Sequence, residues 1–162
     1  MSADDNVKIL DQFIMDFIKT KMEDTNYFSK RIQKDFYTAE ELEETNKAFS
    51  QYKELNPEAV AIYAGSENGD LVIYPRADLP ADFDATTRPW YQGAMEAKGK
   101  AFITEPYVDA VSGNILITVA QKLGDSSGVI GIDLSLSALS ELSNNIKIGK
   151  EGYPAILSAE GS

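Results

Sequence analysis

The sequence contains no cysteine and no histidine. Without cysteine there is no thiolate nucleophile, and without histidine there is no imidazole base and no serine triad that depends on one. Zinc sites of the usual kind are excluded for the same reason, and we expect no metal and no cofactor. The lack of cysteine does not decide the compartment, because an exported bacterial domain can also do without disulfides.

Positive charge is also scarce. The chain has 15 Lys and Arg against 26 Asp and Glu, a formal net charge of −11. Such a surface repels nucleic acid and anionic lipid headgroups, so we expect neither as a partner. Against this background any arginine beside a binding surface stands out.

Long apolar runs are absent, and no stretch reaches the roughly 18 residues that a membrane span needs. The N-terminus lacks the basic, apolar and small-residue order of a signal peptide. The 162 residues are 43% hydrophobic and 25% charged, close to the average of globular proteins. We therefore expect one folded domain and a soluble fragment.

The spacing of apolar residues predicts several helices. A long helix is expected over residues 7–36 and a second over 38–55, begun by a capping box of Thr38 and Glu41. A short helix follows Thr86 or Thr87, either of which could cap it, and a last helix is expected over residues 135–146.

Short runs bounded by turn residues predict strands between these helices. We expect hairpins formed by residues 59–64 with 71–75 and by 102–109 with 115–121, and a further strand over 129–134. Strands joined by tight turns pair antiparallel. The sequence thus predicts an α+β fold with an antiparallel sheet of about five strands flanked by helices.

The stretch TTRPWYQGA places Arg88, Trp90 and Tyr91 at the start of the short helix. A helix N-terminus favours an anion. On the strands, the two-residue period places Tyr107 and Asp109 on one face.

Asp133 shares its strand face with Gly131, which leaves a gap where a group could approach the sheet. The Arg88 guanidinium is positive and the carboxylates of Asp109 and Asp133 are negative. These opposite charges match the carboxylate and the ammonium group of a free amino acid. The alternative is that Arg88 pairs with Asp133 or Asp84, while Trp90 and Tyr91 cover the core.

Three blocks carry a family resemblance: DATTRPWYQGA, ITEPYVDAVSGNILITVAQ and GVIGIDLSLSAL. In this order and spacing they resemble the membrane-distal module of double Cache (dCache) sensor domains, the extracytoplasmic ligand-binding parts of bacterial chemoreceptors and sensor kinases. The resemblance implies a PAS-like Cache sheet over residues 37–146, preceded by the long helix of residues 1–36. GKEGYPAILSAEGS resembles the opening of the membrane-proximal module, so residues 147–162 would begin that module.

By the same resemblance, the site is of the amino-acid-binding type. Arg88 and Trp90 would hold the ligand carboxylate with help from Tyr91. Asp133 would bind the ammonium, with Tyr107 and Asp109 nearby. The family usually has tyrosine where this chain has Phe83.

Other readings of these residues remain open. Phe83 and Tyr63 are possible walls of the site, although Tyr63 also fits the core. Asp109 could instead cap the turn before Gly113.

Rival functions also remain open. The ligand could be an amine, a purine or a small carboxylic acid, or the chain could be a ligand-free module that dimerises through its long helix. An enzyme using Glu105, Asp109 or Asp133 as acid and base is conceivable. The facing arginine indicates binding instead, so we expect no enzyme. The membrane would be reached only through flanking segments.

Overall fold

The computed structural model describes residues 3–108 and 113–136. The chain divides into two compact units, Met1–Lys19 with Leu136–Ser162, and Thr20–Ser135. The described part of the first unit is residues 3–19 and Leu136. The second unit contains every described strand and the sheet on which the candidate site lies. Among the described helices, none has both the length and the apolar character that a membrane span requires.

The helices predicted over residues 7–36, over 38–55 and after Thr87 are present, with changed ends. Helix α1 runs over Ala3–Arg31 and α2 over Ala39–Leu55. The first helix therefore stops at Arg31 and not at residue 36. Asp35 takes a φ of +74°, which a right-handed helix does not allow, and the Lys34 amide donates to Asp125 Oδ2 at 2.6 Å instead of to a helical carbonyl.

Two predicted helix caps are wrong. Thr38 does precede α2, but its hydroxyl donates to the Asp35 carbonyl oxygen at 2.8 Å and does not cap the helix. Neither Thr86 nor Thr87 caps α3, which spans Pro89–Glu96. These threonines lie in a 3-10 turn, Ala85–Thr87, capped by the Asp84 carboxylate. Arg88 is the residue before α3, and Pro89 occupies its first turn as predicted.

The sheet has six strands, all paired antiparallel. They are β1 (Ala59–Ser66), β2 (Leu71–Tyr74), β3 (Phe102–Ile103), β4 (Tyr107–Val108), β5 (Ile115–Lys122) and β6 (Gly128–Ser135). The order is β2-β1-β6-β5-β3, and β4 also pairs with β5. The sheet gains a sixth strand because the predicted strand of residues 102–109 breaks into β3 and β4 around Pro106, which has no N–H for a ladder.

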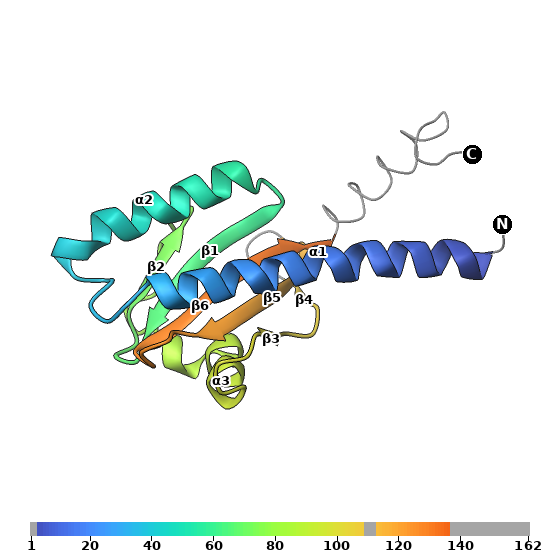
Figure 1. The fold of residues 1–162 in the computed structure, drawn as a ribbon. Coiled ribbons are helices and arrows are strands. Elements are labelled where there is room, and N and C mark those ends of the chain that lie inside the picture. Colours follow the sequence, from blue (N-terminus) through green and yellow to red (C-terminus); the bar gives the residue numbers. More distant parts are fainter. Residues whose placement is uncertain (1–2, 109–112, 137–162) are drawn as a thin grey trace. The chain divides into compact units, whose positions relative to one another are not determined.

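Helices cover both faces of this sheet (Figure 1). The C-terminal part of α1 and α2 pack on one face, where aromatic rings of the two helices meet in edge-to-face contacts. This face contains the larger core, made of Phe28, Phe49, Ile62, Val119, Ile130, Ile132 and Leu134. Helix α3 packs on the other face against β5 and β6. The predicted helix over 135–146 lies, beyond Leu136, outside the described residues.

A buried ammonium group joins α1 to the segment that leads into β1. Lys21 is 3% exposed, and its Nζ lies 2.7 Å from Glu58 Oε2 and 3.6 Å from Asp24 Oδ2. The same ammonium donates to Asn56 Oδ1 at 2.8 Å and lies 5.5 Å from the centre of the Tyr52 ring. Because Glu58 directly precedes β1, this polar cluster fixes where that strand begins relative to α1.

Candidate functional site

Asp133 lies in β6, between β1 and β5, on the sheet face that α3 partly covers. Its cross-strand partners are Ala61 on β1 and Thr118 on β5. Ile130, Ile132 and Leu134 are fully buried on the face covered by α1 and α2, whereas Asp133, on the opposite face, is only partly buried. The predicted separation of these two faces is confirmed. The cross-strand neighbours of Asp133 on both sides are small.

Three hydroxyl groups surround one oxygen of this carboxylate. Asp133 Oδ1 accepts a hydrogen bond from Tyr63 at 2.6 Å and one from Thr118 at 2.7 Å. The hydroxyl of Tyr107 lies 2.9 Å from Thr118 Oγ1 and 3.5 Å from Asp133 Oδ1. Hydrogen bonds to an ionised group are roughly twice as strong as neutral ones, so this arrangement stabilises a carboxylate in mid-sheet.

The ring of Tyr63 fills the space above Gly131, the position opposite it on β6. A Cβ atom at position 131 would come within 2.7 Å of Tyr63 Cε2. The gap expected at Gly131 is therefore occupied by the protein itself and does not admit a ligand. Burial, and next the neighbouring charge of Asp133, raise the pKa of the Tyr63 phenol well above its usual value, so the hydroxyl keeps its proton and remains a donor.

Trp90 extends this aromatic wall. Its ring contacts that of Tyr63 edge-on, with centroids 4.8 Å apart. Gly65 makes room for it, because a Cβ there would meet Trp90 Cη2 at 2.9 Å. Tyr91 is 5% exposed and packs with Ala85, Ala94, Ala120 and Val129, so it lies in the small core under α3. Trp90 thus stands between that core and the Asp133 cluster.

Arg88 is exposed, and its guanidinium carbon lies 6.0 Å from the centre of the Phe83 ring. Phe83 itself is partly buried against the core under α3. Within the described residues, no ion pair joins Arg88 to Asp84 or to Asp133. Asp84 instead accepts hydrogen bonds from the Thr86 amide and hydroxyl. The internal salt bridge considered for Arg88 is therefore not formed with either residue.

The structure brings Tyr63, Tyr107 and Asp133 together and places Trp90 beside them. Asp109 lies outside the described residues. Thr118 belongs to the cluster but was not singled out from sequence. Its place in the alternation of β5 could have put it on the right face, yet only the pairing of β5 with β6 puts it next to Asp133.

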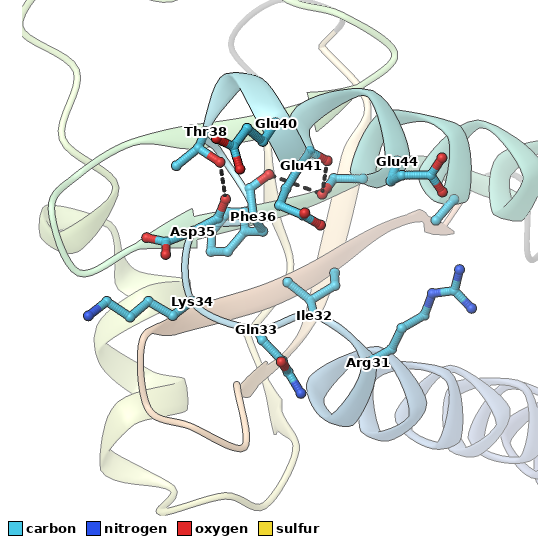
Figure 2. Close-up of a pocket in the computed structure, with 12 residues that line it drawn as sticks. Arg31, Ile32, Gln33, Lys34, Asp35, Phe36, Thr38, Glu40, Glu41 and Glu44 are labelled. Atoms are coloured by element: carbon cyan, nitrogen blue, oxygen red, sulfur yellow. Dashed lines mark hydrogen bonds between the residues drawn. The ribbon is translucent and has the colours of Figure 1, made fainter.

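A separate cavity of about 800 Å³ lies between the end of α1, residues 32–38 and the beginning of α2 (Figure 2). Arg31 and Glu44 stand on opposite sides of it. Its charged side chains are exposed. Its buried hydroxyl, that of Thr45, already donates to backbone carbonyl oxygens of Phe36 and Glu41 at 3.0 Å. Among the described residues, no group of acidic side chains is placed to hold a metal ion.

Sequence comparison identifies relatives of one kind. The methyl-accepting chemotaxis protein TlpA of Bacillus subtilis (strain 168) is 41% identical over 162 residues, covering 97% of this chain and 24% of TlpA. TlpB of the same organism is 39% identical over 155 residues, covering 96% of this chain and 23% of TlpB. The chain thus spans about a quarter of the length of these curated relatives.

Solved structures that resemble this chain are also chemoreceptor domains. The ligand-binding domain of the Pseudomonas fluorescens chemoreceptor CtaA, in complex with L-leucine, is 30% identical with a TM-score of 0.66, over 82% of this chain and 56% of that one. The ligand-binding domain of PctB, an amino acid chemoreceptor of Pseudomonas aeruginosa PAO1, in complex with L-Arg, is 26% identical with a TM-score of 0.69, over 88% and 55%.

The fold and the relatives define the class of the protein as a sensor domain of the double Cache type. More particularly, the chain belongs to the family of the CACHD1 central domain, whose family model matches residues 1–133. The relatives named above are methyl-accepting chemotaxis proteins and ligand-binding domains of chemoreceptors.

Proposed function

We propose that this chain is the ligand-binding module of a bacterial chemoreceptor, located outside the cytoplasm, and that it binds a free L-α-amino acid. The observation that carries the proposal is the partly buried Asp133 carboxylate, held by the hydroxyls of Tyr63 and Thr118. A carboxylate that is fixed in position is a suitable partner for an ammonium group.

The other pole of the ligand is assigned to the segment before α3. Arg88 is exposed, lies in the turn next to Trp90 and forms no ion pair with Asp84 or Asp133 within the described residues. Its guanidinium can therefore meet a ligand carboxylate, with Trp90 beside it and Tyr91 supporting Trp90 from the core. Each charge-assisted hydrogen bond contributes about 1.5 to 3 kcal/mol, so both poles matter for affinity. Asp109 belongs to the ammonium pole in this proposal.

The structural neighbours support this choice of ligand class. Their ligand-binding domains are in complex with L-leucine in CtaA and with L-Arg in PctB. Phe83 lies beneath the Arg88 guanidinium, at a centroid distance of 6.0 Å, and offers it a ring face but no hydroxyl. Phe83 is thus a wall of the carboxylate end in this proposal, and Tyr63 a wall of the ammonium end.

A thermal-unfolding panel tests the proposal. Ligand-stripped protein is heated with each of the twenty L-amino acids, with simple amines and with dicarboxylates. Ligand at a hundred times its dissociation constant stabilises by about 2.7 kcal/mol, which raises the melting temperature by roughly 5 to 10 °C for a chain of this size. Asp133→Asn and Arg88→Gln should each abolish the rise, whereas the exposed controls Asp78→Asn and Arg76→Gln should keep it.

The other outcomes decide between the alternatives. A rise with amines alone that survives Arg88→Gln would show an amine sensor. A rise with dicarboxylates alone that survives Asp133→Asn would show a sensor for carboxylic acids. No rise with any compound would contradict the proposal and leave the ligand-free dimerisation module as the better account.

In the whole receptor, residues 37–146 form the membrane-distal module and residues 147–162 begin the membrane-proximal one. The module binds its ligand without turnover and passes the signal along α1, through which two copies pair. Sedimentation at high protein concentration, with and without ligand, tests the pairing. A monomer under both conditions would contradict it for this chain.

A further inference from the structure

In each hydrogen bond among the three hydroxyls and Asp133, the donor and the acceptor can be assigned. An ionised carboxylate only accepts hydrogen bonds, so Tyr63 and Thr118 are both donors to Oδ1, at 2.6 and 2.7 Å. The Thr118 hydroxyl has one proton, and that proton is given to Asp133. The 2.9 Å hydrogen bond between Tyr107 and Thr118 must therefore be donated by Tyr107.

We propose that Thr118 is a positioning residue of the amino-acid site: it turns the Tyr107 proton inward, so that the Tyr107 phenol oxygen and the Asp133 carboxylate both present lone pairs to the ligand ammonium. This inference rests on the proposed function. An ammonium group carries only donors. Because the Tyr63 and Thr118 protons point to Asp133 and the Tyr107 proton points to Thr118, these three hydrogen bonds leave acceptor lone pairs for the ligand.

The location of Thr118 suits this role. It is fully buried in the interior of β5. Its N–H donates to Thr104 Oγ1 and its carbonyl oxygen accepts from the Thr104 N–H, both at 2.9 Å. Thr104 belongs to the segment that joins β3 to β4, so these bonds hold that segment in register with β5.

Tyr107, in contrast, lies at the margin of the sheet. It is 38% exposed, and within the described residues its strand β4 covers Tyr107–Val108. Its hydroxyl lies 3.5 Å from Asp133, at the long limit for a hydrogen bond, so the 2.9 Å bond to Thr118 is the stronger of the two. Thr118 therefore connects Tyr107, which is partly exposed on β4, with the carboxylate on the central strand β6.

Three substitutions distinguish the effect of the Thr118 hydroxyl from the effect of the shape of its side chain. Thr118→Val removes the hydroxyl but keeps the branched side chain and both backbone hydrogen bonds to Thr104. Thr118→Ser keeps the hydroxyl. Thr45→Val is the matched control, because it removes another buried hydroxyl, on α2 and remote from Asp133.

A first measurement needs no ligand. Protein labelled with ¹³C at the tyrosine Cζ atoms is observed by NMR, and the Tyr107 resonance is assigned with Tyr107→Phe. Thr118→Val should shift this resonance, since the phenol loses its acceptor, whereas Thr118→Ser and Thr45→Val should leave it in place. An unshifted Tyr107 resonance in Thr118→Val would overturn the proposed direction of the hydrogen bonds.

Titration calorimetry with the amino acid that the thermal panel identifies gives the second readout. Thr118→Val should weaken binding about tenfold, the effect of one hydrogen bond to a charged group, and Thr118→Ser should restore affinity to within about threefold of the original. Tyr107→Phe should weaken binding by a similar factor, and both changes together should cost no more than either alone. Unchanged affinity in Thr118→Val would overturn the positioning role.

The two readouts also separate this inference from the proposed function. If no amino acid binds the unaltered protein, the proposed function fails, and the positioning role fails with it even where the tyrosine spectra confirm the hydrogen-bond direction. If amino acids bind and Thr118→Val behaves like the unaltered protein, only the inference fails. Should Thr118→Val not fold, Thr118→Ala takes its place, because it also removes the hydroxyl. It should bind about tenfold more weakly than Thr118→Ser, and equal affinity of these two variants would overturn the inference.

Discussion

Replacing Lys21 by methionine should destabilise the protein strongly. The ammonium is 3% exposed, and its 2.7 Å partner Glu58 has a side chain that is 14% exposed. Methionine fills a similar volume but carries no charge, so Glu58 and Asp24 lose their counter-charge and Asn56 Oδ1 loses a donor. Removing one member of a buried ion pair costs about 3 to 5 kcal/mol. We expect about 3 kcal/mol, because Asp24 is 34% exposed and can be solvated.

Urea unfolding measures this loss. With a slope of about 2 kcal/mol per molar urea, a loss of about 3 kcal/mol moves the midpoint down by roughly 1.5 M. Lys30→Met is the matched control on the same helix, since Lys30 is exposed, and it should change the free energy of unfolding by less than about 0.5 kcal/mol.

A second variant distinguishes a lost charge partner from poor packing of methionine. Adding Glu58→Gln to Lys21→Met removes the unpaired carboxylate and should recover part of the loss, since the penalty comes from the uncompensated charge. If the free energy of unfolding of Lys21→Met lies within about 0.5 kcal/mol of that of the unaltered protein, the buried ammonium does not hold α1 to the segment before β1. That result would refute the reasoning.

The remaining predictions concern the sheet face around Asp133. Gly131→Ala should cost about 1 to 3 kcal/mol in thermal or urea unfolding, because overpacking displaces a neighbour and the new Cβ would lie 2.7 Å from Tyr63 Cε2. Gly124→Ala, whose Cβ would lie 3.4 Å from the nearest atom, is the control and should cost far less. The raised pKa of Tyr63 means that the folded state keeps a proton which the unfolded state loses above pH 10, so stability should fall as the pH rises beyond 10, by up to about 1.4 kcal/mol per pH unit. Tyr63→Phe should reduce this slope in urea unfolding between pH 9 and 11, and an unchanged slope would show that the phenol ionises equally in both states.

The order and type of most elements could be predicted from the sequence. Alternation within β6 correctly separated Asp133 from its buried neighbours, because side-chain direction in a strand depends on local geometry alone. The end of α1 could not be predicted, since the apolar spacing continues through Ile32 and Phe36, which are buried although they lie outside the helix. Apolar periodicity shows burial, and here burial continues where the helical backbone does not.

The composition of the candidate site was only partly predictable, for a different reason. Tyr63 and Thr118 reach Asp133 across strand pairs, Tyr63 opposite Gly131 and Thr118 opposite Asp133 itself. Alternation assigns a face to each residue but does not say which strands are neighbours or in what register they pair. Gly131 is an example. Its missing side chain predicts that some group lies close to the sheet there, but only the strand register identifies that group as the ring of Tyr63.

Strand β1 connects the two polar clusters of the molecule. It begins at Ala59, directly after Glu58, which binds the Lys21 ammonium of α1, and it carries Tyr63, which binds Asp133. Both contacts are short, at 2.7 Å to Lys21 and 2.6 Å to Asp133. A ligand that displaced Tyr63 would act on a strand whose beginning is fixed to α1 by an ion pair. The two contacts therefore hold one strand at two points, its beginning to α1 and its middle to β6.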